Sequence, residues 1–309
     1  MTDTQNEVFK TPVNKIRLFE HGAPGSQNLK LTRKYYTEDM PDGRVKHIVQ
    51  NITDPDIVPY IPDGIGNSTD RQRIPAVLII PGGAFRRLVY NFEGEDVAKW
   101  LNSMGIAAFV LECRLPSDEH DNAEDVPLID AMRAMRVIRG RAQEFGIDEA
   151  KIGVMAALLS TAYESDVYAD YKYKDEYDKL SARPDFAVCS YPVISIDDCI
   201  EAGKRYMSEE QVLERISDSK AKILHKYNPD KLVRPDMPPV FICETDDDRT
   251  TLSENSVGFY MAARKAGVSA ELHIFRTGGH GYGCGDDFAQ TGEWKVLFTK
   301  WIKSIGIIS

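Results

Sequence analysis

Residues 74–80, IPAVLII, form an unbroken apolar run, and this run limits the possible folds more than any other feature of the chain. Side chains of a strand alternate between its two faces, so a strand that is apolar throughout must be covered on both faces, as in a parallel sheet between helices. Residues 106–112 (IAAFVLE) repeat the pattern. Between them, residues 93–104 have helical spacing and are followed by Gly105, a typical helix terminator. This alternation predicts an α/β fold with a mostly parallel, doubly wound sheet.

The same alternation continues to the C-terminus. A helix is predicted at residues 128–145, with Pro127 in its first turn, and a buried strand at residues 151–155. Further strands are expected at residues 46–53, 184–194, 238–244 and 269–275, and further helices at residues 252–266 and 294–305. Residues 1–30 are polar and are expected to form a surface arm or an edge strand. No linker-like segment divides the 309 residues, so we expect one domain, residues 1–309.

The charge of the chain excludes some classes of partner. The formal net charge is −10 at pH 7, and a protein without a basic face cannot displace counterions from a phosphate backbone, so nucleic acid is not expected as a partner. Residues 1–19 have neither a cationic start nor an apolar segment, and no uncharged run approaches the roughly 18 residues that span a membrane. We therefore expect a soluble, cytoplasmic protein without a membrane partner.

Metal and cofactor sites have no signature in this sequence. The five cysteines are far apart and form no CxxC pair, which favours buried, reduced thiols over a zinc site. The chain has no HExxH motif, no cluster of Cys and His, and no GxGxxG after a predicted strand. The sequence therefore predicts neither a metal nor an organic cofactor.

Three predicted strands are followed by residue types that acyl transfer requires. Gly82 and Gly83 follow the first apolar strand, Asp248 follows the penultimate strand, and His280 lies between glycines after the last. Because the carboxyl ends of parallel strands meet at one edge of a sheet, these residues are expected to converge. The glycines let backbone N–H groups approach an oxyanion, His280 has the chemistry of a general base, and Asp248 would fix its tautomer. Each feature alone has another explanation: the two glycines fit a plain turn, His280 fits an exposed loop, and the aspartates fit a solvated acidic loop.

Residues 75–309 resemble the esterase- and lipase-like α/β hydrolases of the acetyl-xylan esterase and BD-FAE-like type. The resemblance rests on the stretches VLIIPGGAFRRL, EGEDVAKWLNSMGIAAFVL, PLIDAMRAMRVIRGRA, GIDEAKIGVM, ARPDFAVCSYPVIS and ENSVGFYMAARKAGVSAELHIFRTGGHGYG. It implies an α/β hydrolase fold in which the charged, helical residues 197–234 form a small cap. It further implies an oxyanion hole at Gly82 and Gly83, a triad acid at Asp248 and a triad base at His280. Substrates of such enzymes are small acyl esters, often acetyl groups on sugars.

The junction after residues 151–155 departs from that family. Relatives carry a G-x-S-x-G turn there, which holds the nucleophilic serine, whereas Met155 is joined directly to AALL, so about eight residues are absent by comparison. No G-x-S-x-G occurs anywhere in the chain. Ser160 is the nearest substitute, but Leu158 is too large for the strained turn, and the alternative is that Ser160 faces outward from an ordinary helix. The shortened junction is also expected to fray between residues 154 and 165.

Two functions remain open on the sequence alone. The first is a carboxylic ester hydrolase whose activity is impaired or absent, because the nucleophile turn is missing. Residual turnover would then depend on Ser160 or on water activated by His280. The second is a non-catalytic protein that binds a carbohydrate or acyl ligand in the same pocket. The expected partner is in both cases a small-molecule ester, with acetylated sugars as one class, while the acyl group and the oligomeric state are not predicted.

Overall fold

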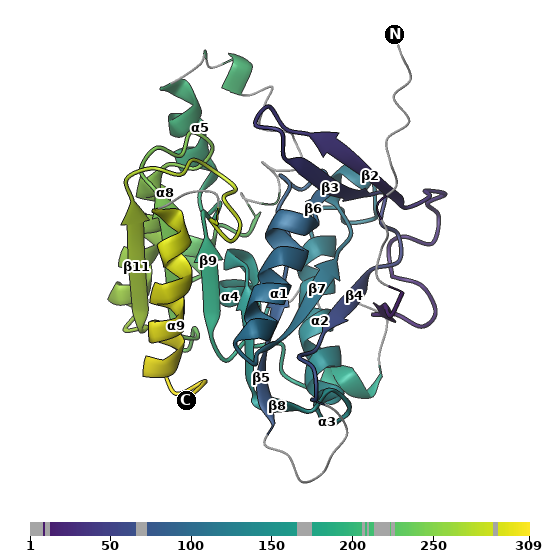
Figure 1. Ribbon diagram of the computed structural model, residues 1–309. Helices are drawn as coiled ribbons and strands as arrows, with labels where there is room; N and C mark the ends of the chain where they lie inside the picture. The colour runs from purple at the N-terminus through teal and green to yellow at the C-terminus, as the bar shows by residue number, and fades with distance from the viewer. Residues whose placement is uncertain are drawn as a thin grey trace.

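The computed structural model describes residue 9 and residues 13–65, 73–165, 175–205, 208, 210–212, 223, 226–286 and 290–309. Within these residues the main sheet has eight strands. Their order across the sheet is β1 (Ile16–Arg17), β4 (Asp56–Tyr60), β7 (Ala107–Glu112), β5 (Ile74–Ile79), β8 (Ile147–Met155), β9 (Ala187–Ser190), β10 (Val240–Thr245) and β11 (Ala270–Phe275). Figure 1 labels several of them, including β5, β7, β9 and β11. Every neighbouring pair from β7 to β11 is parallel, whereas β4 is antiparallel to both of its neighbours.

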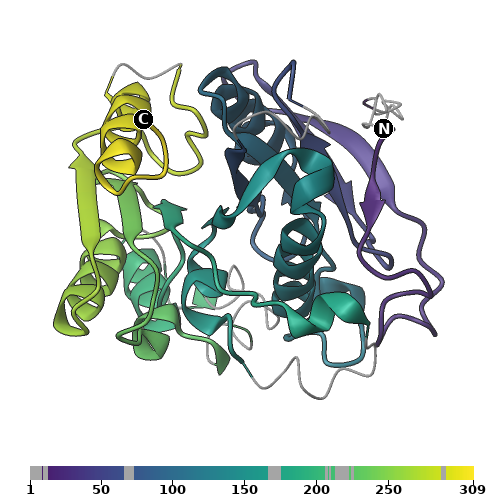
Figure 2. The same ribbon diagram turned by 90° about the horizontal axis from the view of Figure 1, so that it is seen from below.

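Helices cover both faces of this sheet. On one face, α1 (Asp96–Ser103) and α9 (Trp294–Ser304) lie together, and the rings of Trp100 and Trp294 meet edge to face with centroids 4.7 Å apart. Figures 1 and 2 show α2 (Val126–Gly140), α4 (Ala157–Ala162) and α8 (Ser253–Lys265) on the opposite face. β7 and β10 are buried along their whole length, as a strand covered on both faces must be, and this includes Glu112 and Glu244 near their ends. The predicted α/β class with a mostly parallel, doubly wound sheet is confirmed.

Several element boundaries differ from the prediction for local reasons. β9 ends at Ser190 instead of residue 194, because Tyr191 has a positive φ of 38° and a proline follows it. β8 begins at Ile147 instead of residue 151, and its pairing with β5 shifts register where its polar residues occur. The helix predicted at residues 93–104 begins as a π-helical turn (Asn91–Glu95) before α1, and the one predicted at residues 128–145 is divided into α2 and α3 (Ala142–Phe145).

The N-terminal part of the chain adds a second, three-stranded antiparallel sheet. It consists of β2 (Lys34–Asp39), β3 (Val45–Gln50) and β6 (Leu88–Val89), so the strand predicted at residues 46–53 is confirmed as β3. The edge strand expected within residues 1–30 is β1. Leu18 and Phe19 directly after it are buried, so this portion of the chain belongs to the core rather than to a surface arm. Residues 1–8 and 10–12 lie outside the described part.

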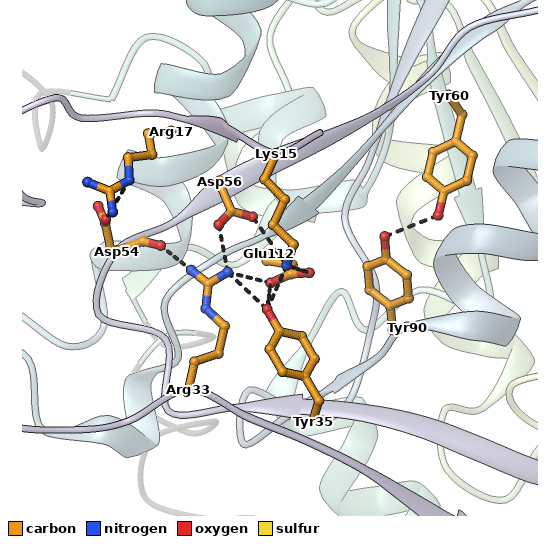
Figure 3. A network of polar contacts seen from close by, with 9 residues as sticks. All are labelled: Lys15, Arg17, Arg33, Tyr35, Asp54, Asp56, Tyr60, Tyr90 and Glu112. Atoms are coloured by element: carbon orange, nitrogen blue, oxygen red, sulfur yellow. Dashed lines mark hydrogen bonds and ion pairs between the residues drawn. The ribbon is translucent and has the colours of Figure 1, made fainter. Parts of the chain in front are cut away.

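A group of five side chains, Lys15, Arg33, Tyr35, Asp56 and Glu112, joins the N-terminal segment to the end of β7 (Figure 3). We call it the N-terminal charge cluster. Glu112 is fully buried. The Nη1 atom of Arg33 lies 2.6 Å from the carboxylate of Glu112 and 2.6 Å from the carboxylate of Asp56. Lys15 Nζ lies 2.6 Å from Glu112, and the Tyr35 hydroxyl donates to the same carboxylate at 2.9 Å. Burial, followed by the nearby charge of Glu112, raises the pKa of Asp56 to about 6.

Two further expectations can be compared with the described residues. Cys113, Cys189 and Cys243 are buried free thiols, as predicted, whereas Cys284 is partly exposed and the side chain of Cys199 lies outside the described part. The cap expected at residues 197–234 is described only in part. Its described elements include α5 (Ile196–Lys204) and a short 3-10 helix, Pro229–Leu232. Among the described residues, no helix has both the length and the apolar character that crossing a membrane would need.

Candidate active site

Asp248 and His280 form a hydrogen-bonded pair. Asp248 lies in the turn after β10, is 1% exposed, and accepts hydrogen bonds from the backbone N–H groups of Thr250 (2.6 Å) and Thr251 (2.9 Å). Its Oδ2 is 2.7 Å from Nδ1 of His280, in the loop after β11. Burial by itself would raise the pKa of Asp248, but the hydrogen bond and charge of His280, together with the two N–H groups, lower it below the usual value. The carboxylate therefore stays ionised and holds the imidazole by Nδ1.

The residue before this aspartate, Asp247, fixes the loop that carries the histidine. Its Oδ1 accepts hydrogen bonds from the N–H groups of Gly278 at 2.9 Å and Gly279 at 2.8 Å. Both glycines have positive φ, and a Cβ on Gly278 would lie 2.3 Å from a methyl group of Thr291. Two neighbouring acids after β10 therefore have different roles. Asp247 binds the backbone of the loop that carries His280, and Asp248 binds the His280 ring. The sequence indicated an acidic turn and did not separate the two roles.

A pocket of about 260 Å³ lies at the carboxyl ends of the central strands. Its lining includes Gly82 and Gly83 after β5, Met155 at the end of β8, and His280, so the structure brings together the predicted strand ends. Most of the remaining wall is apolar and includes Phe85, Leu115, Leu128, Leu158 and Val193. The volume is slightly below the roughly 300 Å³ at which sites for drug-sized ligands begin, which fits a small ligand.

The loop after β5 turns tightly around the pocket. Gly83, Ala84 and Phe85 have positive φ values of 144°, 57° and 61°, which is unusual for two residues with side chains. A Cβ on Gly83 would lie 2.0 Å from the carbonyl oxygen of Arg87, so only glycine fits there. Gly82 and Gly83 both line the pocket, and the oxyanion-hole role expected for them stays a prediction.

Glu93 is a pocket residue that the sequence reasoning missed. Its Oε2 accepts a hydrogen bond from the N–H of Gly82 at 2.9 Å, and its Oε1 lies 3.6 Å from the position that a Cβ of Gly281 would occupy. Burial raises the pKa of Glu93, although the charge of His280 and the Gly82 N–H both act in the opposite direction. In sequence this glutamate belongs to a predicted amphipathic helix, where an acid in the first turn is ordinary. No sequence signal distinguishes it.

A second acid, Glu244, lies at the end of β10, close to Asp248. It is fully buried, and its two oxygens accept hydrogen bonds from Thr245 N at 2.9 Å and from Ser256 Oγ at 3.2 Å. Burial, followed by the charge of Asp248, raises the pKa of Glu244 to about 9. The two neighbouring carboxyl groups therefore differ at neutral pH, since Glu244 keeps its proton and Asp248 does not.

Ser160, the predicted substitute nucleophile, lies apart from this pocket. β8 ends at Met155, Ala156 is extended, and α4 begins at the next residue and is only six residues long. Ser160 is fully buried, its Oγ donates to the carbonyl of Ala157 at 2.5 Å, and it is not among the described residues that line the pocket. The expectation that Ser160 faces outward is wrong, because α4 lies against α2, β9 and the helix Pro229–Leu232. The expected fraying is also not found, since the strand leads directly into the helix.

Ser190, Cys113, Cys189 and Tyr191 also line the pocket. Ser190 at the end of β9 accepts a hydrogen bond from Cys243 Sγ at 3.2 Å. Burial raises the pKa of the Cys113 and Cys189 thiols. The Tyr191 ring lies edge to face against the His280 ring, with centroids 5.1 Å apart. Within the described part of the chain, no group of three or more His, Cys, Asp or Glu residues is arranged to hold a metal ion.

Comparison with known proteins assigns the chain to a family. A family model described as BD-FAE matches residues 65–262, about two thirds of the 309 residues. The chain belongs to the BD-FAE family. The match to BD-FAE includes the Gly82 loop, Glu93 and Asp248, and it ends before His280.

Two curated relatives have similar sequences. An acetylxylan esterase of Xylanibacter ruminicola is 29% identical over 232 residues, which cover 74% of this BD-FAE chain and 45% of that protein. Endo-1,4-beta-xylanase B of Butyrivibrio fibrisolvens is 29% identical over 223 residues, which cover 71% of this chain and 34% of that protein. The chain thus spans less than half the length of these two relatives.

Solved structures show the same fold over nearly the whole chain. The acetyl ester-xyloside bifunctional hydrolase of Caldicellulosiruptor lactoaceticus is 31% identical, with a TM-score of 0.70, and the alignment covers 96% of this chain and 97% of that one. Esterase 2 of Thermogutta terrifontis, at 20% identity, has a TM-score of 0.65 with 90% and 96% of the two chains covered. The BD-FAE chain therefore has the α/β hydrolase fold that the resemblance implied.

Proposed function

We propose that this BD-FAE chain binds small carboxylic esters, acetylated carbohydrates among them, in the pocket between Gly83 and His280. The observation that carries the proposal is the 2.7 Å contact of His280 Nδ1 with Asp248 Oδ2 beside a largely apolar pocket. A histidine held at one ring nitrogen by a buried carboxylate has the other nitrogen left to take a proton. The names of the Xylanibacter and Caldicellulosiruptor relatives support the acetyl and carbohydrate part of the proposal.

Turnover in this pocket would use water in place of a serine. His280 Nε2 takes a proton from a water molecule while the water oxygen bonds to the acyl carbon, and the carbonyl oxygen becomes negatively charged. When the bond from the acyl carbon to the alcohol oxygen breaks, His280 returns the proton to the leaving oxygen. Asp248 stays ionised and stabilises the imidazolium. We expect this route to be slow, because no nucleophile turn follows β8 and Ser160 bonds to its own helix.

A second function, binding without turnover, is favoured by one observation. The N–H of Gly82, which the family resemblance assigns to the oxyanion hole, is bonded to Glu93. An engaged donor does not stabilise developing charge, and the loss of one oxyanion donor typically costs about a hundredfold in rate. In this case the pocket would bind an acyl or carbohydrate ligand and release it unchanged.

The two functions are separated by hydrolysis of p-nitrophenyl acetate. We expect a rate at least about a hundredfold below that of a relative with an intact G-x-S-x-G turn, and we expect His280→Ala to remove what remains. His273→Ala is the matched control, because His273 bonds to Glu271 on β11 and is not among the pocket-lining residues. Binding of an acetylated xylo-oligosaccharide without any His280-dependent turnover would favour the second function. Rapid labelling of Ser160 by a fluorophosphonate would contradict both.

A further inference from the structure

The carboxylate of Glu93 lies between the two loops that form the pocket. On one side its Oε2 accepts the Gly82 N–H at 2.9 Å, and a Cβ on Gly82 would lie only 2.3 Å from the same oxygen. On the other side its Oε1 is 3.6 Å from the Cβ position of Gly281, the residue after His280. Both Glu93 and His280 line the pocket. The carboxylate therefore lies where the loop after β5 approaches the loop that carries the base.

The backbone around Glu93 holds it in this place. The π-helical turn Asn91–Glu95 is anchored by Asn91, which accepts the N–H of His47 at 2.9 Å and donates to the carbonyl of Val45 at 2.8 Å. Gly94 lets the turn approach the sheet, since a Cβ there would lie 3.0 Å from Val110 and 3.3 Å from Pro81. The position of Glu93 is thus set by the turn and by the sheet end beneath it.

We propose that Glu93 is an internal competitor that occupies the Gly82 N–H and so limits the binding of acyl ligands through a carbonyl or carboxylate oxygen. An acyl oxygen and the glutamate oxygen need the same donor, and an N–H group of this geometry serves one strong acceptor at a time. A carboxylate ligand meets like-charge repulsion in addition. This inference rests on the proposed function, because it takes the pocket to be an acyl site, and it adds that a residue of the chain controls access to that site.

The test measures acetate binding, because acetate is the acid that an acetyl ester would release. Glu93→Gln keeps an acceptor oxygen and removes the charge, whereas Glu93→Ala removes both. Glu95→Gln is the matched control: Glu95 is in the same turn, bonds to Lys99 at 2.8 Å, and is not among the described lining residues. Dissociation constants are measured by NMR titration at pH 7.5, with the 15N-labelled Gly82 amide as reporter.

We expect Glu93→Ala to bind acetate at least about tenfold more tightly than the unmodified chain, with Glu93→Gln between them and Glu95→Gln unchanged. The Gly82 amide signal should move in Glu93→Ala before any acetate is added, because its hydrogen bond is lost. Equal acetate affinity in all four proteins would overturn the competitor role and leave the acyl pocket standing. No acetate binding in any of them would overturn both. The glutamine variant preserves size, so the comparison holds even if the alanine variant folds poorly.

Discussion

The N-terminal charge cluster and the candidate active site both bury carboxyl groups, but they differ in what accompanies those groups. In the cluster, Asp56 and Glu112 face two cations, Lys15 and Arg33, within hydrogen-bond or ion-pair distance (Figure 3). In the candidate active site, Asp248 is bonded to the His280 ring beside a largely apolar pocket. Glu93 instead accepts the N–H of Gly82, and Glu244 accepts hydrogen bonds from Thr245 N and Ser256 Oγ. Acids paired with Lys and Arg join parts of the chain, whereas an acid paired with a histidine beside a cavity can take part in chemistry.

The largest effect on stability is expected when one cation of the N-terminal charge cluster is removed. Arg33→Met leaves Asp56 and Glu112 with Lys15 as their only cation in the cluster, so we expect the free energy of unfolding to fall by about 3 kcal/mol. Urea denaturation measures the loss. Arg17→Met is the control, since its ion pair with Asp54 is largely exposed, and we expect less than about 1 kcal/mol there. Equal losses in the two variants would mean that the cluster contributes no more than an exposed ion pair.

In the candidate active site, removing the charge of one acid should lower the rate of hydrolysis more than it lowers stability. Asp248→Asn preserves the size of the side chain but removes the charge that holds His280 by Nδ1, so we expect residual hydrolysis of p-nitrophenyl acetate to fall about a hundredfold. The carboxamide oxygen can still accept the N–H groups of Thr250 and Thr251, so the melting temperature should change little. A large drop in melting temperature with unchanged specific activity of the folded fraction would instead make Asp248 a structural acid, like those of the N-terminal cluster.

The sequence predicted the parts of this molecule that depend on local pattern. Apolar runs gave β5, β7 and β10, because a strand buried on both faces needs no other signal. The contact between Asp248 and His280 could also be predicted. The two residues follow neighbouring parallel strands, which end at the same edge of the sheet, and an acid followed by a histidine is the order expected of a catalytic pair.

The remaining features depend on which distant residues meet. Glu93 reaches the N–H of Gly82 because it lies in a π-helical turn. Such a turn has no sequence signature, so the sequence predicted an ordinary helix at this glutamate. Lys15 and Glu112 are 97 positions apart, and their pairing follows from the path of the N-terminal segment. The early end of β9 follows from the positive φ of Tyr191, an unusual conformation for a tyrosine.

The two regions should also differ in the pH range over which their acids affect stability. The pKa of Glu244 is raised to about 9 in the folded protein from an unfolded value near 4.5, so the folded state retains a proton that the unfolded state loses. Its contribution to stability therefore declines as pH rises from about 4.5 to 9. Glu244→Gln lacks this decline, and the difference in unfolding free energy between variant and parent should grow by at least about 1 kcal/mol between pH 5 and pH 8. Thermal melts across this range measure it.

Asp56 provides the matched comparison for this pH dependence. Its pKa is raised to about 6, so the same sign applies over a lower window, from about 3.8 to 6. The difference between Asp56→Asn and the parent should therefore stop changing above about pH 6, while that of Glu244→Gln continues to grow. Parallel curves for the two variants would show that Glu244, the acid next to Asp248, and Asp56 of the charge cluster are buried alike.

The smallest effect is expected at Ser160. Its hydroxyl bonds to the carbonyl of Ala157 within α4, so Ser160→Ala removes one local hydrogen bond and supplies a better helix former. We expect the free energy of unfolding to change by less than about 1 kcal/mol and the residual hydrolysis of p-nitrophenyl acetate to stay within about twofold. Thr161→Ala is the matched control, because the Thr161 hydroxyl makes the same kind of bond to Leu158 at 3.2 Å. If Ser160→Ala alone abolished turnover, α4 would have to rearrange to bring the serine to His280, and the chain would be a serine hydrolase after all.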